Sequence, residues 1–135
     1  MAERDLETLL KTLKVKRHDH IWRFETIPGE ASSWADLVSL RNVRDIAMLF
    51  QEDEGLTVIT QADAETRADN RWVWLELSVH SDLHTVGFLA AIANALSAEN
   101  IPCNSVSAVH HDHVFVPEDQ ADKAITALEA RASKA

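Results

Sequence analysis

The sequence predicts an α+β fold built from two similar units, and two observations lead to this prediction. Residues 72–128 read as strand, helix, strand, strand, helix, and residues 20–69 repeat that order. Alternating apolar and polar residues mark the strands, while apolar residues three and four apart mark the helices. This order is typical of the split βαβ, or ferredoxin-like, plan (βαββαβ), in which helices cover one face of an antiparallel sheet. We expect residues 1–69 and 70–135 to form two such units, packed side by side because no flexible linker separates them.

The second half of the chain carries the clearer pattern. In WVWLELSVH the residues Val73, Leu75, Leu77 and Val79 form an entirely apolar strand face. The predicted elements are a strand over residues 72–80, a helix from Val86 to about Asn100, strands over 103–109 and 114–116, and a helix that opens at Pro117. In the ferredoxin-like plan the end of the first strand and the turn at residues 110–113 lie at the same edge of the sheet.

The first half is less regular. Its predicted elements are a helix over residues 6–13, a strand over 20–27, a helix from Ser32 or Ser33 to Leu40, strands over 44–50 and 56–60, and a short helix over 61–69. The second unit has no candidate for its last strand after Ala130. Residues Lys14–Arg17 are our candidate for that edge.

Composition excludes several classes of function. The 135 residues carry 13 basic and 22 acidic side chains, a net charge of −9, which opposes binding to nucleic acid or to an anionic membrane. No apolar run approaches the roughly 20 residues of a membrane span, and residues 1–13 lack the apolar stretch of a signal peptide. A single cysteine, Cys103, excludes an internal disulfide and a CxxC metal site. We therefore expect a cytoplasmic protein.

Several segments resemble one known family. In the second half they are LELSVHS (75–81), SDLHTVGF (81–88), ALSAENI (95–101), CNSVSAV (103–109) and DHVFVPEDQADKAITAL (112–128). In the first half they are Pro28, Trp34 and EGLTVIT (54–60). These segments resemble the ACT domain family, and the layout resembles its small tandem members. The chain departs from the family's usual D-x-P-G loop, because the loop before the helix is longer and lacks the proline.

The resemblance implies a non-catalytic regulatory protein that binds a small molecule, often an amino acid, between two ACT units. It implies contacts from the loop before the helix of one unit and from the start of the second strand of the other, with His80 at a position that contacts ligand in such domains. It is also compatible with a homodimer and with a separate protein that the chain regulates. The candidate ligand-binding residues are His80, Ser81, Asp82, His84, Gly87 and Phe88 opposite Arg44 and Asp45, and Trp34 opposite Cys103 and Asn104.

Elementary chemistry supports this location. A helix that begins near Val86 directs free N–H groups toward the loop, which suits a carboxylate, and Gly87 permits close approach to the backbone. Asp82 or Glu76 could pair with an α-amino group.

Two alternatives of other classes stay open. His80, Asp112 and His113 could bind a metal ion, although their spacing matches no specific motif. An unpaired edge strand could make the chain a structural or dimerisation module. Catalysis is disfavoured, since the sequence has no G-x-S-x-G elbow and no glycine-rich nucleotide loop, and we expect no cofactor.

Overall fold

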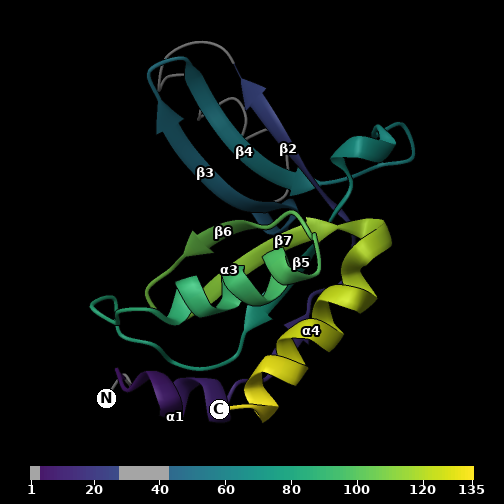
Figure 1. Ribbon diagram of the computed structural model, residues 1–135. Coiled ribbons are helices and arrows are strands. Elements are labelled where there is room, and N and C mark those ends of the chain that lie inside the picture. Colours follow the sequence, from purple (N-terminus) through teal and green to yellow (C-terminus); the bar gives the residue numbers. More distant parts are fainter. Residues whose placement is uncertain (1–3, 28–42) are drawn as a thin grey trace. The chain divides into compact units, whose positions relative to one another are not determined.

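A computed structural model describes residues 4–27 and 43–135, and its contacts divide the chain into two compact units (Figure 1). Unit 1 joins Met1–Asp19 to Trp72–Ala135, and unit 2 is His20–Arg71. The helix predicted over residues 32–40 lies outside the described residues. None of the helices in the described part of the chain combines the length and the apolar character that a membrane span needs.

Unit 1 contains an antiparallel sheet. Its strands, in spatial order, are β1 (Val15–Arg17), β5 (Trp72–Leu77), β7 (Asp112–Pro117) and β6 (Asn104–Ser107). Strand β1 pairs with β5, with Val15 opposite Leu77 and Arg17 opposite Leu75. The expectation that Lys14–Arg17 supplies the missing edge strand is therefore confirmed. The N-terminal segment completes the unit formed by the second half of the chain.

Three helices pack together in unit 1: α1 (Leu6–Lys11), α3 (Phe88–Ala98) and α4 (Ala121–Ser133). Asp5 caps α1, because its Oδ2 accepts a hydrogen bond from the Thr8 amide at 3.0 Å. A short 3₁₀ turn, η3 (Glu118–Gln120), follows Pro117 and leads into α4. The sequence predicts that this helix opens at Pro117. A 3₁₀ turn does follow Pro117, and the α-helix itself begins one turn later, at Ala121.

The alternation in β5 separates two faces of the unit 1 sheet. Val73, Leu75 and Leu77 are fully buried, whereas Trp74 and Glu76 on the other face stay partly exposed. Buried apolar residues of the sheet and of the helices form the core, and the apolar face of β5 that the sequence predicts belongs to it. They are Leu9, Leu10, Leu13, Val73, Leu75, Leu77, Phe88, Ile92, Leu96, Ile101, Val114, Val116, Ala121, Ala124 and Leu128.

In the described part of unit 2, three strands form an antiparallel arrangement. Its strands, in spatial order, are β3 (Ile46–Glu52), β4 (Gly55–Gln61) and β2 (Trp22–Ile27), and β3 follows a 3₁₀ turn, η1 (Val43–Asp45). Glu52 lies opposite Gly55 in a tight hairpin that joins the two strands predicted over residues 44–50 and 56–60. Leu56 and Val58 are buried and pack against Ile27 and Leu49.

The helix predicted over residues 61–69 is wrong. This segment forms turns and a short 3₁₀ element, η2 (Ala68–Asn70). The Asp63 carboxylate accepts a hydrogen bond from the Glu65 amide at 2.9 Å, and the Thr66 hydroxyl accepts one from the Asp63 amide at 3.0 Å. Because these side chains satisfy nearby backbone groups locally, they compete with the helical hydrogen bonds. Arg23 of β2 also holds Asp63 in an ion pair at 3.1 Å.

Candidate ligand-binding site

The loop between β5 and α3 is built around Asp82. Its Oδ1 accepts a hydrogen bond from the His84 amide at 2.7 Å, and its Oδ2 accepts one from Arg4 at 3.2 Å. The Thr85 amide donates to the Asp82 carbonyl at 3.0 Å, which closes a turn. The His84 amide, and secondarily Arg4, lower the pKa of the Asp82 carboxyl from its ordinary value. The loop therefore presents a carboxylate that stays ionised at neutral pH.

A small hollow of about 170 Å³ lies between this loop, the start of α3 and the hairpin that joins β6 to β7. Ser81 lies at its base, 7 % exposed, and its Oγ donates to Asp112 Oδ2 at 3.2 Å. The lining residues are Ser81, Asp82, Leu83, Thr85, Phe88, Leu89, Ser107, Ala108 and Asp112. Two carboxylates and two serine hydroxyls thus meet apolar side chains in a volume smaller than the roughly 300–1,000 Å³ of drug-sized pockets.

Helix α3 begins beside this hollow without a side-chain cap. Gly87 occupies the N-cap position with φ +92°, and its carbonyl accepts the first helical hydrogen bond from Ala91 at 3.0 Å. A left-handed backbone of this kind favours glycine. A Cβ at this position would make only an ordinary van der Waals contact with Leu6 Cδ2 of α1, at 3.4 Å, so the backbone conformation is what requires glycine.

Substitution of Gly87 by alanine is expected to reduce the free energy of unfolding by about 1–2 kcal/mol, because an L-residue is strained at this φ. Urea denaturation followed by circular dichroism measures the change. Ser97→Ala, at an exposed position of the same helix, is the control and should stay within about 0.5 kcal/mol of the wild type. A stabilised Gly87→Ala chain would contradict the left-handed conformation, since alanine stabilises wherever the backbone accepts it.

The two halves of the chain each match a known family model. Residues 70–130 match an ACT domain model, and residues 1–71 match a second ACT domain model. The chain belongs to the ACT domain family. ACT domains are regulatory, non-catalytic modules that bind small molecules, and the tandem arrangement agrees with the resemblance noted in the sequence.

Solved structures similar to this ACT protein share its fold. A Vibrio cholerae protein of unknown function, a possible transport protein, is 30% identical with a TM-score of 0.75, and the match covers 94% of this chain and 95% of that one. An Agrobacterium tumefaciens protein is 16% identical, with a TM-score of 0.68 and 89% of each chain covered. The regulatory subunit of aspartate kinase from Thermus flavus is 14% identical, with a TM-score of 0.64 and coverages of 87% and 95%. No curated protein matches the chain.

The residues that the sequence assigns to the ACT site fall into separate places. Ser81, Asp82 and Phe88 line the small hollow. His84 lies in the same loop, exposed, with Nδ1 3.9 Å from Asp82 Oδ1. The remaining residues do not line the hollow: Gly87 caps α3, Cys103 and Asn104 lie at the start of β6, and Arg44 and Asp45 belong to η1 of unit 2. Trp34 lies outside the described residues.

His80 faces the tip of the β6–β7 hairpin. Its ring centroid lies 5.4 Å from that of His110 and 6.4 Å from that of His111. In the described residues, no group of three or more His, Cys, Asp or Glu side chains is arranged to hold a metal ion. His80, Asp112 and His113 are therefore not drawn together into such a group within this part of the chain.

Sequence reasoning missed the contribution of the hairpin to the hollow. Ser107, Ala108 and Asp112 line it, together with Leu83, Thr85 and Leu89. A signal for the hairpin residues was available, since the ferredoxin-like plan puts the end of β5 and the β6–β7 turn at one edge of the sheet. The metal hypothesis for His80, Asp112 and His113 rests on that edge, whereas the ligand hypothesis includes no residue of the β6–β7 turn.

A second polar cluster lies on the face of the unit 1 sheet that carries Trp74 and Glu76. The His18 ring stacks on Trp74 with centroids 3.8 Å apart, and His18 Nε2 lies 2.9 Å from Glu76 Oε1. Trp74 Nε1 donates to His113 Nδ1 at 2.9 Å. An indole nitrogen can only donate, so the proton of neutral His113 resides on Nε2. Burial lowers the pKa of His113, against the opposing charge of Glu76.

Proposed function

We propose that this protein is a non-catalytic regulator that binds an amino acid at the hollow between the β5–α3 loop and the β6–β7 hairpin. The observation that supports the proposal most is the juxtaposition of Asp82 and Asp112 with the start of α3. Two carboxylates attract an ammonium group, and the amides at the beginning of a helix attract a carboxylate. An α-amino acid carries both groups on one carbon atom.

The aspartate kinase regulatory subunits share the fold at low identity, which is compatible with this role. In this proposal, the ligand stabilises one arrangement of the chain, and the protein that it regulates reads that arrangement. The contacts that the internal symmetry of the sequence suggests for Arg44 and Asp45, and for Trp34, Cys103 and Asn104, stay predictions from the sequence. The cytoplasm is the proposed location.

Calorimetry against the twenty amino acids tests the ligand class. We expect one or a few to bind in the micromolar to millimolar range, and Asp112→Asn to weaken that binding about tenfold or more. A hydrogen bond to a charged group contributes roughly 1.5–3 kcal/mol, which corresponds to this change. Asparagine keeps the shape of the side chain and an acceptor for Ser81 Oγ, so the fold should remain intact.

Asp119→Asn is the matched control, because Asp119 is an exposed acid in η3 outside the hollow and the substitution changes the net charge equally. It should leave affinity within about twofold of the wild type. Absence of binding by any amino acid at millimolar concentration, or equal losses in the two variants, would reject the proposal. A melting temperature that rises with protein concentration but not with amino acids would favour the dimerisation module instead.

A further inference from the structure

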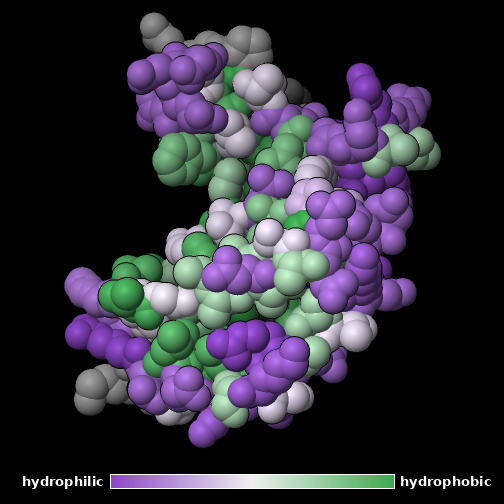
Figure 2. Space-filling view, in the orientation of Figure 1, coloured by the Kyte–Doolittle hydropathy of each residue, from purple (hydrophilic) through white to green (hydrophobic). Residues whose placement is uncertain are grey.

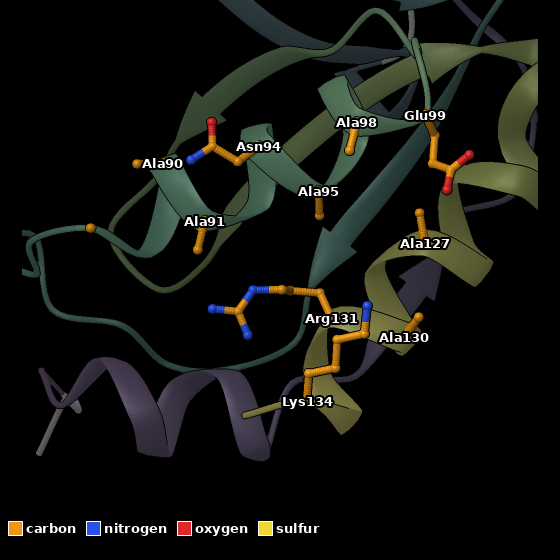
Figure 3. A pocket seen from close by; sticks show the side chains of 11 residues that line it. Ala90, Ala91, Asn94, Ala95, Ala98, Glu99, Ala127, Ala130, Arg131 and Lys134 are labelled. Atoms are coloured by element: carbon orange, nitrogen blue, oxygen red, sulfur yellow. The ribbon is translucent and has the colours of Figure 1, made fainter.

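A larger groove, of about 510 Å³, lies between α3 and α4 (Figure 3). The large side chains of α3, Phe88, Ile92 and Leu96, are buried in the core. The wall of the groove is therefore formed mostly by small side chains. The lining residues are Gly87, Ala90, Ala91, Asn94, Ala95, Ala98, Glu99, Ala127, Ala130, Arg131 and Lys134. The groove shares no residue with the hollow of the proposed amino-acid site.

The exposed face of α3 is unusual for a helix that meets solvent. Its sequence, FLAAIANALSA, contains no charged residue, although 26% of the chain is charged. A surface helix ordinarily carries charged and polar residues on its outer face. The exposed positions are instead Ala90, Ala93, Asn94, Ser97 and Ala98. In Figure 2 the surface over α3 is largely pale green, whereas hydrophilic residues dominate over α4. This composition favours contact with another protein surface.

The charges of the groove lie at opposite ends. Lys123 Nζ donates to the Glu99 carbonyl at 3.1 Å, so the start of α4 adjoins the end of α3. Arg131 and Lys134 line the groove eight and eleven residues after Lys123, about 12 and 16 Å further along α4 at 1.5 Å per residue. The exposed Glu99 carboxylate lies at the other end, with its Oε2 3.9 Å from Lys123 Nζ. Figure 3 shows both side chains across the groove from Ala91 and Ala95. Neither side chain makes a hydrogen bond or ion pair with the described residues.

We propose that this groove receives α3 of a second copy of the chain, with the two α3 helices antiparallel about a twofold axis. In a twofold interface every contact occurs twice with the roles exchanged. The antiparallel arrangement brings the partner's Glu99 to the end that holds Arg131 and Lys134, and the reciprocal pair forms at the other end. A groove with one acidic and one basic end is therefore complementary to itself.

The small side chains provide the shape that such packing requires. The distance between two packed helices depends on the side chains at their contact, and it is shortest where these are small. Ala91 and Ala95 face the groove one turn apart, so a second helix can approach α3 closely along its length. A second copy also supplies a helix of equal length with an uncharged outer face.

Sedimentation equilibrium of the full chain tests the proposal. We expect a dimer at micromolar concentration, and Ala95→Glu should raise its dissociation constant about tenfold or more, because it places a carboxylate in the helix contact. Ala64→Glu is the matched control, since Ala64 is exposed and lies in unit 2. It makes the same change in charge and should leave the dissociation constant within about twofold. Circular dichroism verifies that both variants fold.

Charge exchange distinguishes this interface from others. Arg131→Glu and Glu99→Arg should each weaken the dimer, because each sets like charges opposite one another twice. The double variant restores opposite charges and should recover most of the affinity. A wild-type chain that stays monomeric at 100 times that concentration would overturn the proposal, as would a dimer indifferent to Ala95→Glu or a double variant weaker than both single ones.

Discussion

Replacement of Leu10 by alanine is expected to lower the free energy of unfolding by about 2–5 kcal/mol. Leu10 lies on α1 and is 0% exposed, so truncation removes buried apolar surface and leaves a cavity in the core of unit 1. Urea denaturation followed by far-ultraviolet circular dichroism measures the loss. The effect is large for a single substitution, since domains of this size are stable by only about 5–15 kcal/mol.

Leu83→Ala is the matched control for this substitution. Leu83 is 67% exposed, and the same truncation there should change the unfolding free energy by no more than about 0.5 kcal/mol. Equal stability of Leu10→Ala and the wild type would mean that α1 does not pack into the core of unit 1.

The N-terminal segment matters because it supplies both a helix and a strand to unit 1. Val15–Arg17 pairs with β5, and Leu9, Leu10 and Leu13 belong to the core. Unit 1 therefore needs both ends of the chain, whereas unit 2 lies between them in sequence. In folding, the β1–β5 contact must close a loop of more than fifty residues, and such contacts tend to slow folding.

Much of this fold could be predicted because its patterns are strong. Residues 72–77 have one entirely apolar face, so only that face can pack against the core, and it is the buried face of β5. The edge strand at Lys14–Arg17 could be assigned only by elimination, since a strand as short as β1, with three residues, carries no periodicity. The failure at residues 61–69 has a different origin: alanines favour helix, but Asp63 and Thr66 bind the backbone locally, which a periodicity count ignores.

The candidate site was predictable in part for the same reason. Ser81, Asp82 and Phe88 follow directly from the position of the loop between β5 and α3. Asp112 enters from a hairpin some thirty residues later, and only the topology of the sheet places it beside Ser81. His80 occupies the loop position that the family resemblance favours, but its ring faces His110. The direction of a side chain at a strand end depends on tertiary neighbours.

Acidification is expected to destabilise unit 1 through His113. Burial lowers the pKa of this imidazole from its ordinary value of 6.5, and the charges of His18 and His111 act in the same direction, while Glu76 and Asp112 oppose them. The unfolded chain therefore binds more protons than the folded chain between pH 6.5 and the lowered value. The stabilisation from neutral His113 is complete above pH 6.5 and is lost as the pH falls through that window. Urea denaturation at intervals between pH 8 and pH 5 measures this loss.

The hydrogen bond from Trp74 explains why the neutral imidazole is preferred. Protonation places a hydrogen on His113 Nδ1, where it meets the indole N–H, so two donors face each other across a distance that now measures 2.9 Å. His113→Gln keeps an acceptor for Trp74 but cannot titrate, and it should flatten the pH dependence in this window. His84→Gln removes an exposed imidazole outside this cluster, keeps the Trp74–His113 hydrogen bond, and is the control for the loss of one histidine. Equal slopes in the wild type and His113→Gln would exclude His113 as the origin.

Glu76 adds a second, more acidic step. Burial alone would raise the pKa of its carboxyl, but the hydrogen bond from His18 and the charge of His111 outweigh burial and lower it from 4.5. Its contribution to stability is therefore present above pH 4.5 and is lost as the pH falls below that value. The two steps arise from different residues. His113→Gln should remove only the step that begins at pH 6.5, and Glu76→Gln should remove the step below pH 4.5. Because His18 stacks on Trp74 and also donates to Glu76, a His18→Ala variant should weaken both steps at once.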